Sequence, residues 1–116
     1  MTLQDLPDVA KAGWLVKQGG LVRGFKKRYF VLQQGLLYYF KSDQSTSPQG
    51  TVLLESVQVR AASKAEAGRH HAIAIQTPAG RTYMLAATSA EECSMWVVAL
   101  EAQSYLPGLA GEDGNS

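Results

Sequence analysis

Turn residues at short intervals divide most of this chain into runs too short for ordinary helices. Gly19-Gly20, Gln33-Gln34-Gly35, the polar residues 42–49 and Pro78-Ala79-Gly80 are all of types that favour turns. The runs between them are rich in apolar, β-branched and aromatic residues without a helical period, which is typical of strands. We predict strands at residues 12–18, 26–32, 36–41, 51–54, 56–61, 71–77 and 81–87, and a loop at 64–70.

The last predicted element is a helix over about residues 90–103. Ser89 precedes Glu92 by three residues, the spacing of a capping box at a helix N-terminus. Apolar residues then recur at three- and four-residue spacing, which places them on one helical face. These residues are Cys93, Trp96, Val97 and Leu100.

Seven short strands followed by one helix predict an α+β domain. Antiparallel strands of this length must form a sandwich or a small barrel to bury one face each, and we expect the helix, centred on Trp96, to close one open end. The 116 residues suffice for one core. We assign residues 1–10 to an N-terminal tail, 11–104 to the domain and 105–116 to a C-terminal tail or linker.

Several function classes receive no support from the residues. There is no Ser-His-acid set with plausible geometry and no Gly-x-Gly-x-x-Gly motif, so we expect no enzyme and no cofactor. His70-His71 has no Cys or acid at ligand spacing, so we expect no metal site. The apolar runs are too short for a transmembrane helix, and the acidic N-terminus is unlike a signal peptide. The single Cys93 fits a cytoplasmic location.

Positive charge is concentrated around the Gly19-Gly20 turn. Residues 17–30 hold five of the eleven Lys and Arg residues and no acid, although the net charge of the chain is only +1. These five are Lys17, Arg23, Lys26, Lys27 and Arg28. A lone Lys-Lys-Arg run without a nucleic-acid-binding motif is poor evidence for nucleic acid, so we expect no such partner.

A proposed register for the first hairpin brings two of these cations together. Placing Lys17 opposite Arg28 puts Leu15 opposite Phe30, with the two apolar residues facing inward. Like charges directly opposite repel across a ladder. The pair therefore predicts that an anion binds between Lys17 and Arg28.

The second hairpin adds a phenol to this pair. A two-residue turn at Gln33-Gln34 pairs Arg28 with Tyr39 and places Leu37 inward on the same face. Lys26 shares the face of Arg28, whereas Lys27 points the other way. Arginine offers bidentate contacts, lysine a point charge and tyrosine a hydrogen bond, so the predicted ligand is a compact, multiply phosphorylated group.

The turn itself contributes further candidates. Arg23 adds a fourth cation, and the glycines permit backbone N–H groups to approach a ligand. Leu21, Val22 and Phe25 are unusual in a solvated turn. They form a candidate membrane-contacting loop, and two alternatives are open: insertion into the bilayer interface or packing on the rim of the barrel.

Together, GWLVKQGG, KKRYFVL, LLYYF and the C-terminal helix with Trp96 resemble the pleckstrin homology (PH) family over residues 11–104. The resemblance implies a seven-stranded, bent antiparallel barrel capped by one C-terminal helix. It also implies a signalling module that binds phosphoinositides of the cytosolic leaflet or, alternatively, a protein-binding adaptor with weak or nonspecific acidic phospholipid binding. Under both alternatives we expect a cytoplasmic domain that is recruited peripherally to membranes.

One subset of this family binds 3-phosphorylated inositol lipids, and Lys17, Lys26-Lys27-Arg28 and Tyr39 match its basic signature. The resemblance implies that Lys17 and Arg28 bind the 3- and 4-phosphates, Tyr39 the 4-phosphate and Arg23 the 5-phosphate side. Gln49 stands where the family often has a further Arg. The choice between PtdIns(3,4)P2 and PtdIns(3,4,5)P3 therefore stays open.

Overall fold

The computed structural model describes residues 8–19 and 24–105. Seven antiparallel strands form one sheet in the order β4-β3-β2-β1-β7-β6-β5. The strands are β1 (Val9–Gln18), β2 (Phe25–Gln33), β3 (Leu36–Phe40), β4 (Gly50–Leu53), β5 (Gln58–Ala62), β6 (Ala72–Gln76) and β7 (Thr82–Ala86). The helices are α1 (Lys64–Ala67) and α2 (Ala90–Gln103). The α+β prediction is confirmed.

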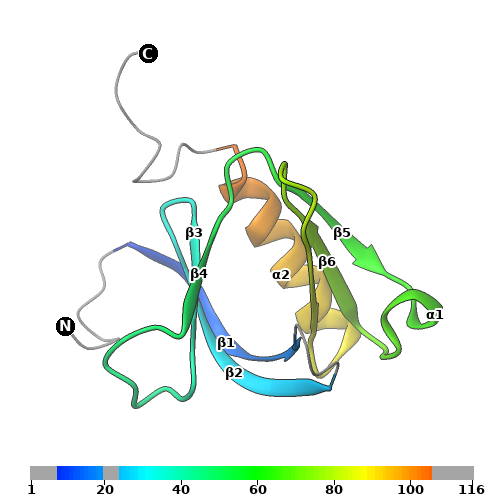
Figure 1. The fold of residues 1–116 in the computed structure, drawn as a ribbon, viewed down its shortest axis with the longest axis horizontal. Coiled ribbons are helices and arrows are strands. Elements are labelled where there is room, and N and C mark those ends of the chain that lie inside the picture. The colour runs from blue at the N-terminus through cyan, green and yellow to red at the C-terminus, as the bar shows by residue number, and fades with distance from the viewer. Residues whose placement is uncertain (1–7, 20–23, 106–116) are drawn as a thin grey trace.

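The sheet is strongly bent but does not close into a barrel. β4 and β5 stand at opposite ends of the strand order and are not hydrogen-bonded to each other. Figure 1 shows α2 between the β3–β4 end of the sheet and the β5–β6 end, and the helix packs against β1, β5 and β6. The predicted barrel is therefore an open sheet whose core is completed by the helix.

The core lies between the concave face of the sheet and α2. Leu15, Phe30 and Leu37 all face inward as predicted, with exposed fractions of 3%, 1% and 0%. Trp96 of α2 is 1% exposed and packs in the same cluster. A Cβ at Gly13 of β1 would lie 3.7 Å from the Trp96 ring, an ordinary van der Waals distance, so β1 passes directly beside the helix at this point.

The α2 helix begins and ends where the sequence predicts. The Ser89 hydroxyl accepts a hydrogen bond of 3.1 Å from the Glu92 N–H, which satisfies one of the unpaired donors of the first turn. Cys93, Trp96 and Leu100 are buried along one face. The N-cap at Ser89 and the apolar stripe are local signals, and both are confirmed.

The predicted loop at 64–70 was wrong, since α1 occupies Lys64–Ala67. Ser63 accepts a hydrogen bond from the Glu66 N–H, and Gly68 ends the turn in the left-handed conformation at φ 80°. The spacing of Ser63 and Glu66 is that of a second capping box. A single turn is too short to show an apolar period, so pattern reading missed it.

The β2–β3 turn lies one residue later than predicted. Gln34 and Gly35 have φ values of 48° and 80°, and Gln33 pairs with Leu36. Positive φ at both central residues is the type I′ geometry that fits the twist of a tight hairpin, and glycine is favoured there. The turn therefore takes Gly35 as its second central residue, and Tyr39 lies opposite Phe30 instead of Arg28.

The β1–β2 register also differs from the prediction. Lys17 lies opposite Lys26, and Arg28 lies opposite Leu15. Both ladders are displaced by two residues from the predicted pairing, and a displacement of two keeps every side chain on its predicted face. In the observed register Phe30 lies opposite Gly13, and the Phe30 ring packs in the same buried cluster as Trp96.

Candidate functional site

An open cavity of about 280 Å³ lies where the first three strands present their polar ends, and we call it the mouth. Its lining residues are Lys17, Gly19, Lys26, Arg28, Tyr39 and Gln49. None of them is acidic. The structure thus brings four of the five predicted ligand residues to one cavity, and the fifth, Arg23, lies outside the described residues.

Lys17 lies against two aromatic rings at the mouth. Its Nζ is 4.8 Å from the centroid of the Tyr39 ring and 5.8 Å from that of Tyr83. Burial lowers the pKa of Lys17, and the positive charges of Arg81 and Arg28 lower it further. A bound anion would oppose these effects, because it stabilises the charged ammonium.

Arg28 is held by two hydrogen bonds. Its Nε donates to Oε1 of Gln49 at 2.6 Å, and its Nη1 donates to the carbonyl of Lys27 at 2.7 Å. Gln49 is the last residue of the polar stretch after β3, and sequence reasoning treated it only as a departure from the family pattern. The structure shows that Gln49 orients the guanidinium with a neutral acceptor.

The position of Tyr39 depends on Gly50, which sequence reasoning did not single out. Gly50 lies opposite Tyr39 in the β3–β4 ladder, and a Cβ at Gly50 would overlap the phenol ring and hydroxyl of Tyr39. Because Gly50 has no side chain, the Tyr39 ring can lie across β4. Gly50 comes directly before the predicted strand 51–54 and is the first residue of the observed β4, and a glycine in a strand is a signal for such close approach.

The opposite face of the hairpin carries Lys27 and Phe25. The Lys27 Nζ lies 4.7 Å from the centroid of a Trp14 ring, away from the mouth. Phe25 is half-buried and packs against a small cluster formed by Ala67, Ala72 and Ala86. The other two residues of the candidate membrane-contacting loop, Leu21 and Val22, lie outside the described residues.

The described residues also bear on metal binding and on membrane crossing. Among residues 8–19 and 24–105, no group of three or more His, Cys, Asp or Glu side chains could hold a metal ion. No described helix combines the length and the apolar character that crossing a bilayer requires.

A family model described as "PH domain" matches residues 9–105. The chain belongs to the PH domain family. Its PH domain is 38% identical to mouse Sesquipedalian-1 over 103 residues and 35% identical to human Rho GTPase-activating protein 25 over 111 residues. These matches cover 87% and 88% of this chain but only 37% and 17% of the two relatives.

The fold is also that of solved PH domains. The C-terminal PH domain of pleckstrin, in complex with D-myo-Ins(1,2,3,4,5)P5, matches with a TM-score of 0.73 and 26% identity. That match covers 83% of this chain and 98% of the pleckstrin chain. A PH domain is a non-catalytic module. The GTPase-activating function in one relative's name belongs to a protein in which this region is a small part.

Proposed function

We propose that this PH domain is a membrane-targeting module that binds 3-phosphorylated inositol lipids, PtdIns(3,4)P2 or PtdIns(3,4,5)P3, through the mouth. One observation carries the proposal: three cations and a phenol from three adjacent strands line a single cavity without a carboxylate. The domain would act as a cytoplasmic module that is recruited peripherally to the cytosolic leaflet together with whatever protein contains it.

The chemistry of the mouth supports a multiply phosphorylated ligand. Lys17 and Lys26 lie directly opposite each other, and like charges at such positions destabilise a ladder unless an anion lies between them. Arg28, already oriented by Gln49, can offer a charge-assisted hydrogen bond to a phosphate. By resemblance, we assign the 3- and 4-phosphates to Lys17 and Arg28, the 4-phosphate also to Tyr39, and the 5-phosphate side to Arg23.

The relationship to pleckstrin gives independent support for an inositol phosphate. The pleckstrin domain with D-myo-Ins(1,2,3,4,5)P5 shares the fold of this chain at 26% identity. The preference for a 3-phosphate is the finer part of the proposal, and it depends on the basic signature formed by Lys17, Lys26 and Arg28.

The experiment is vesicle co-sedimentation with phosphatidylcholine–phosphatidylserine vesicles that contain each phosphoinositide in turn. We expect binding to be strongest with the two 3-phosphorylated lipids and to fall at least about tenfold in Arg28→Ala, the scale of a lost charge-assisted hydrogen bond. Lys41→Ala is the matched control, because Lys41 is exposed and does not line the mouth. Equal binding to vesicles with phosphatidylserine alone would reject selective recognition.

Protein binding is the second candidate function, and one apolar surface favours it. Met95 and Val98 of α2 are 47% and 67% exposed, and they border a groove of about 460 Å³ beside Ala10 and Lys11. An amphipathic segment of a partner could pack in such a groove. A partner captured equally well by the wild type and by a Lys17→Ala/Arg28→Ala variant would favour this function over lipid binding.

A further inference from the structure

The loop of residues 41–49, which connects β3 to β4, ends at the mouth. Its last residue, Gln49, lines the mouth and accepts the hydrogen bond of 2.6 Å from Arg28 Nε. The Gln49 N–H donates to the carbonyl of Tyr39 at 2.8 Å, which fixes this end of the loop to β3. A change of charge in the loop therefore takes place beside the mouth.

Hydrogen bonds order the first half of this loop but not the segment 46–48. The Ser42 hydroxyl accepts from the Gln44 N–H at 3.1 Å, and the Ser45 hydroxyl accepts from the Ser42 N–H at 3.2 Å. Residues 46–48 are all exposed, and they form no hydrogen bond with the rest of the described chain. This segment can thus be drawn into the active site of another protein without breaking native hydrogen bonds.

Ser47 is the residue of this segment that carries a recognisable acceptor pattern, because Pro48 follows it. A proline disfavours helical backbone at the residue before it and biases that residue toward an extended conformation. Protein kinases bind the acceptor segment of a substrate in an extended form, and one class of them selects a Ser or Thr that is followed by Pro. Ser47 therefore combines the motif, the exposure and the backbone bias that such a kinase needs.

The only other Ser/Thr-Pro pair of the chain, Thr77-Pro78, lies in a different setting. Thr77 is half-buried, and its N–H and hydroxyl both donate to the Arg81 carbonyl, at 2.8 and 3.1 Å. The Gly80 N–H in turn donates to the Thr77 carbonyl at 2.9 Å. These bonds hold Thr77 in the β6–β7 turn and engage its hydroxyl, so the comparison favours Ser47 as the acceptor.

A phosphate on Ser47 would add negative charge beside a cluster of unpaired cations. It carries a charge of about −1.5 to −2 at neutral pH. Ser47 lies two residues before Gln49, a chain distance of at most about 7 Å, which is within the Debye length of about 8 Å at physiological salt. Among the described residues, no carboxylate forms an ion pair with Lys17, Lys26 or Arg28. The phosphate would thus offset the positive potential of the mouth and repel an anionic leaflet.

We propose that Ser47 is a phosphorylation site for a proline-directed protein kinase, and that its phosphate opposes anion binding at the mouth. In the transfer, Ser47 Oγ forms a bond to the γ-phosphorus of ATP while the bond from that phosphorus to the β–γ bridging oxygen breaks. ADP leaves with the bridging oxygen, and the hydroxyl proton passes to a base of the kinase. The consequence for membrane binding rests on the proposed function, whereas the modification itself does not.

The first test asks whether Ser47 is the acceptor. The 116-residue chain is incubated with Mg²⁺, ATP and a proline-directed kinase of the cyclin-dependent class, and phosphorylated residues are located by mass spectrometry. We expect one phosphate, on Ser47, in the wild type and in the control Thr46→Ala, and none in Ser47→Ala or Pro48→Ala. An unmodified Ser47, or a Thr77 modified as fast as Ser47, overturns the proposal.

The second test measures the effect on the mouth, with phosphoserine incorporated at position 47 during synthesis of the chain. Binding to phosphatidylcholine–phosphatidylserine vesicles that contain PtdIns(3,4,5)P3 should fall about tenfold or more, the scale of roughly two charges near an anionic leaflet. The matched control carries phosphoserine at position 94, because Ser94 is exposed on α2 and does not line the mouth. Equal losses in the two proteins would show that only net charge matters, and would overturn the action at the mouth.

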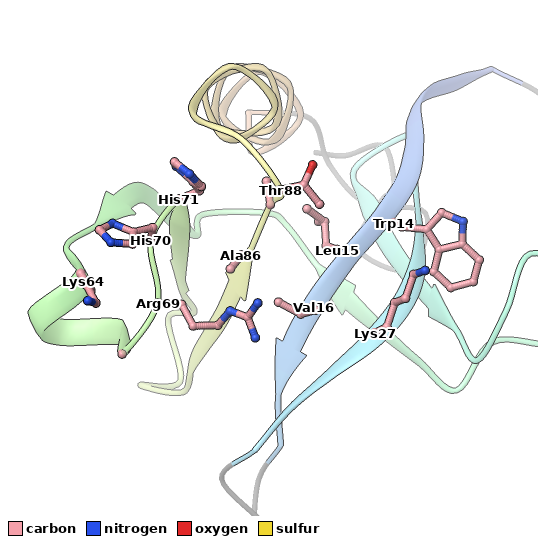
Figure 2. Close-up of a pocket in the computed structure, with 12 residues that line it drawn as sticks. Trp14, Leu15, Val16, Lys27, Lys64, Arg69, His70, His71, Ala86 and Thr88 are labelled. Atoms are coloured by element: carbon pink, nitrogen blue, oxygen red, sulfur yellow. The ribbon is translucent and has the colours of Figure 1, made fainter.

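A measurement without lipid separates this proposal from the proposed function. The side-chain Nε–H signal of Arg28 should shift in the ¹⁵N spectrum when phosphoserine replaces Ser47, and not when it replaces Ser94. The indole N–H of Trp14 should stay unchanged, because Trp14 lies beside Lys27 at a cleft on the opposite face of the hairpin (Figure 2). If the unmodified chain bound no phosphoinositide, the proposed function would fail while the Arg28 signal still tested the phosphate. An unshifted Arg28 signal overturns its action at the mouth.

Discussion

Lys17 lies directly opposite Lys26 in the β1–β2 ladder, and both side chains line the same mouth. Arg28, two residues along β2, adds a third cation from the same face. Like charges in this arrangement destabilise the free domain. β1 and β2 thus bring three cations together at the mouth, where a polyanionic headgroup would reduce the repulsion between them.

Replacing Lys17 by methionine should stabilise the free domain and weaken headgroup binding. Burial and the charges of Arg81 and Arg28 lower the pKa of Lys17, so its ammonium costs free energy at neutral pH. Methionine keeps an unbranched apolar stem without the charge. Thermal unfolding should show a Tm that is higher by no more than a few degrees, since solvent screens much of the cost. An unchanged affinity for phosphoinositide vesicles would remove Lys17 from the site.

The stability difference between Lys17→Met and the wild type should depend on pH. The folded domain binds the Lys17 proton less tightly than the unfolded chain does, because the pKa of Lys17 is lowered from 10.5 on folding. The wild type therefore gains stability as the pH rises from the lowered pKa toward 10.5. Denaturant unfolding at a series of alkaline pH values should show the advantage of the variant shrinking, and a constant advantage would contradict this account.

Gly50→Ala should impair the mouth through Tyr39. The new Cβ would overlap the Tyr39 ring, so the ring must leave its place over β4 and its contact with Lys17. We expect a loss of about 1–3 kcal/mol in the free energy of unfolding, which is typical of overpacking. Affinity for phosphoinositide vesicles should fall about fivefold, the scale of one lost hydrogen bond.

Gly13→Ala is the matched control for Gly50→Ala. Both glycines lie in strands, but a Cβ at Gly13 would meet the Trp96 ring at 3.7 Å, an ordinary van der Waals contact. Vesicle binding should therefore be unchanged in Gly13→Ala. If both variants weakened binding equally, the effect of Gly50→Ala could not be assigned to Tyr39.

Gln49→Glu should weaken binding more than Gln49→Met does. Glutamate keeps the length of Gln49 and can accept the same hydrogen bond from Arg28 Nε, but it places a carboxylate in the mouth. This carboxylate would pair with Arg28 and repel phosphates, so we expect at least about a tenfold loss in vesicle binding. Gln49→Met removes the hydrogen-bond acceptor of Arg28 without adding a charge. An equal loss of vesicle binding in the two variants would show that negative charge in the mouth does not affect binding.

Cys93 should react slowly with thiol reagents in the folded domain. Burial raises the pKa of its thiol, which lies 3.6 Å from the carbonyl of Ala72 and is 7% exposed. The reactive thiolate is therefore disfavoured. Alkylation by iodoacetamide near neutral pH should be slow in the native domain and fast in guanidinium chloride. Similar rates in the two conditions would show that the α2 face opens readily.

Local patterns explain the parts of the fold that were predicted well. The capping box at Ser89 and the apolar stripe of α2 depend on residues within a few positions of one another, so the helix bounds follow from sequence. The inward faces of Leu15, Phe30 and Leu37 follow from the two-residue period of strands. Ser63 and Glu66 have a similar capping spacing at the start of α1, but this helix of four residues is too short to show an apolar period.

The alternation of side chains along a strand predicts which of them share a face, and this is enough to put Lys17, Lys26, Arg28 and Tyr39 on one side of the hairpins. Which of them lie opposite each other depends on the register of the folded sheet, because a slip of two residues leaves every face unchanged. The contact of Gly50 with Tyr39 and the short pairing of β1 with β7 also depend on the tertiary structure. Each brings together residues of different strands, and residue periodicity carries no information about such contacts.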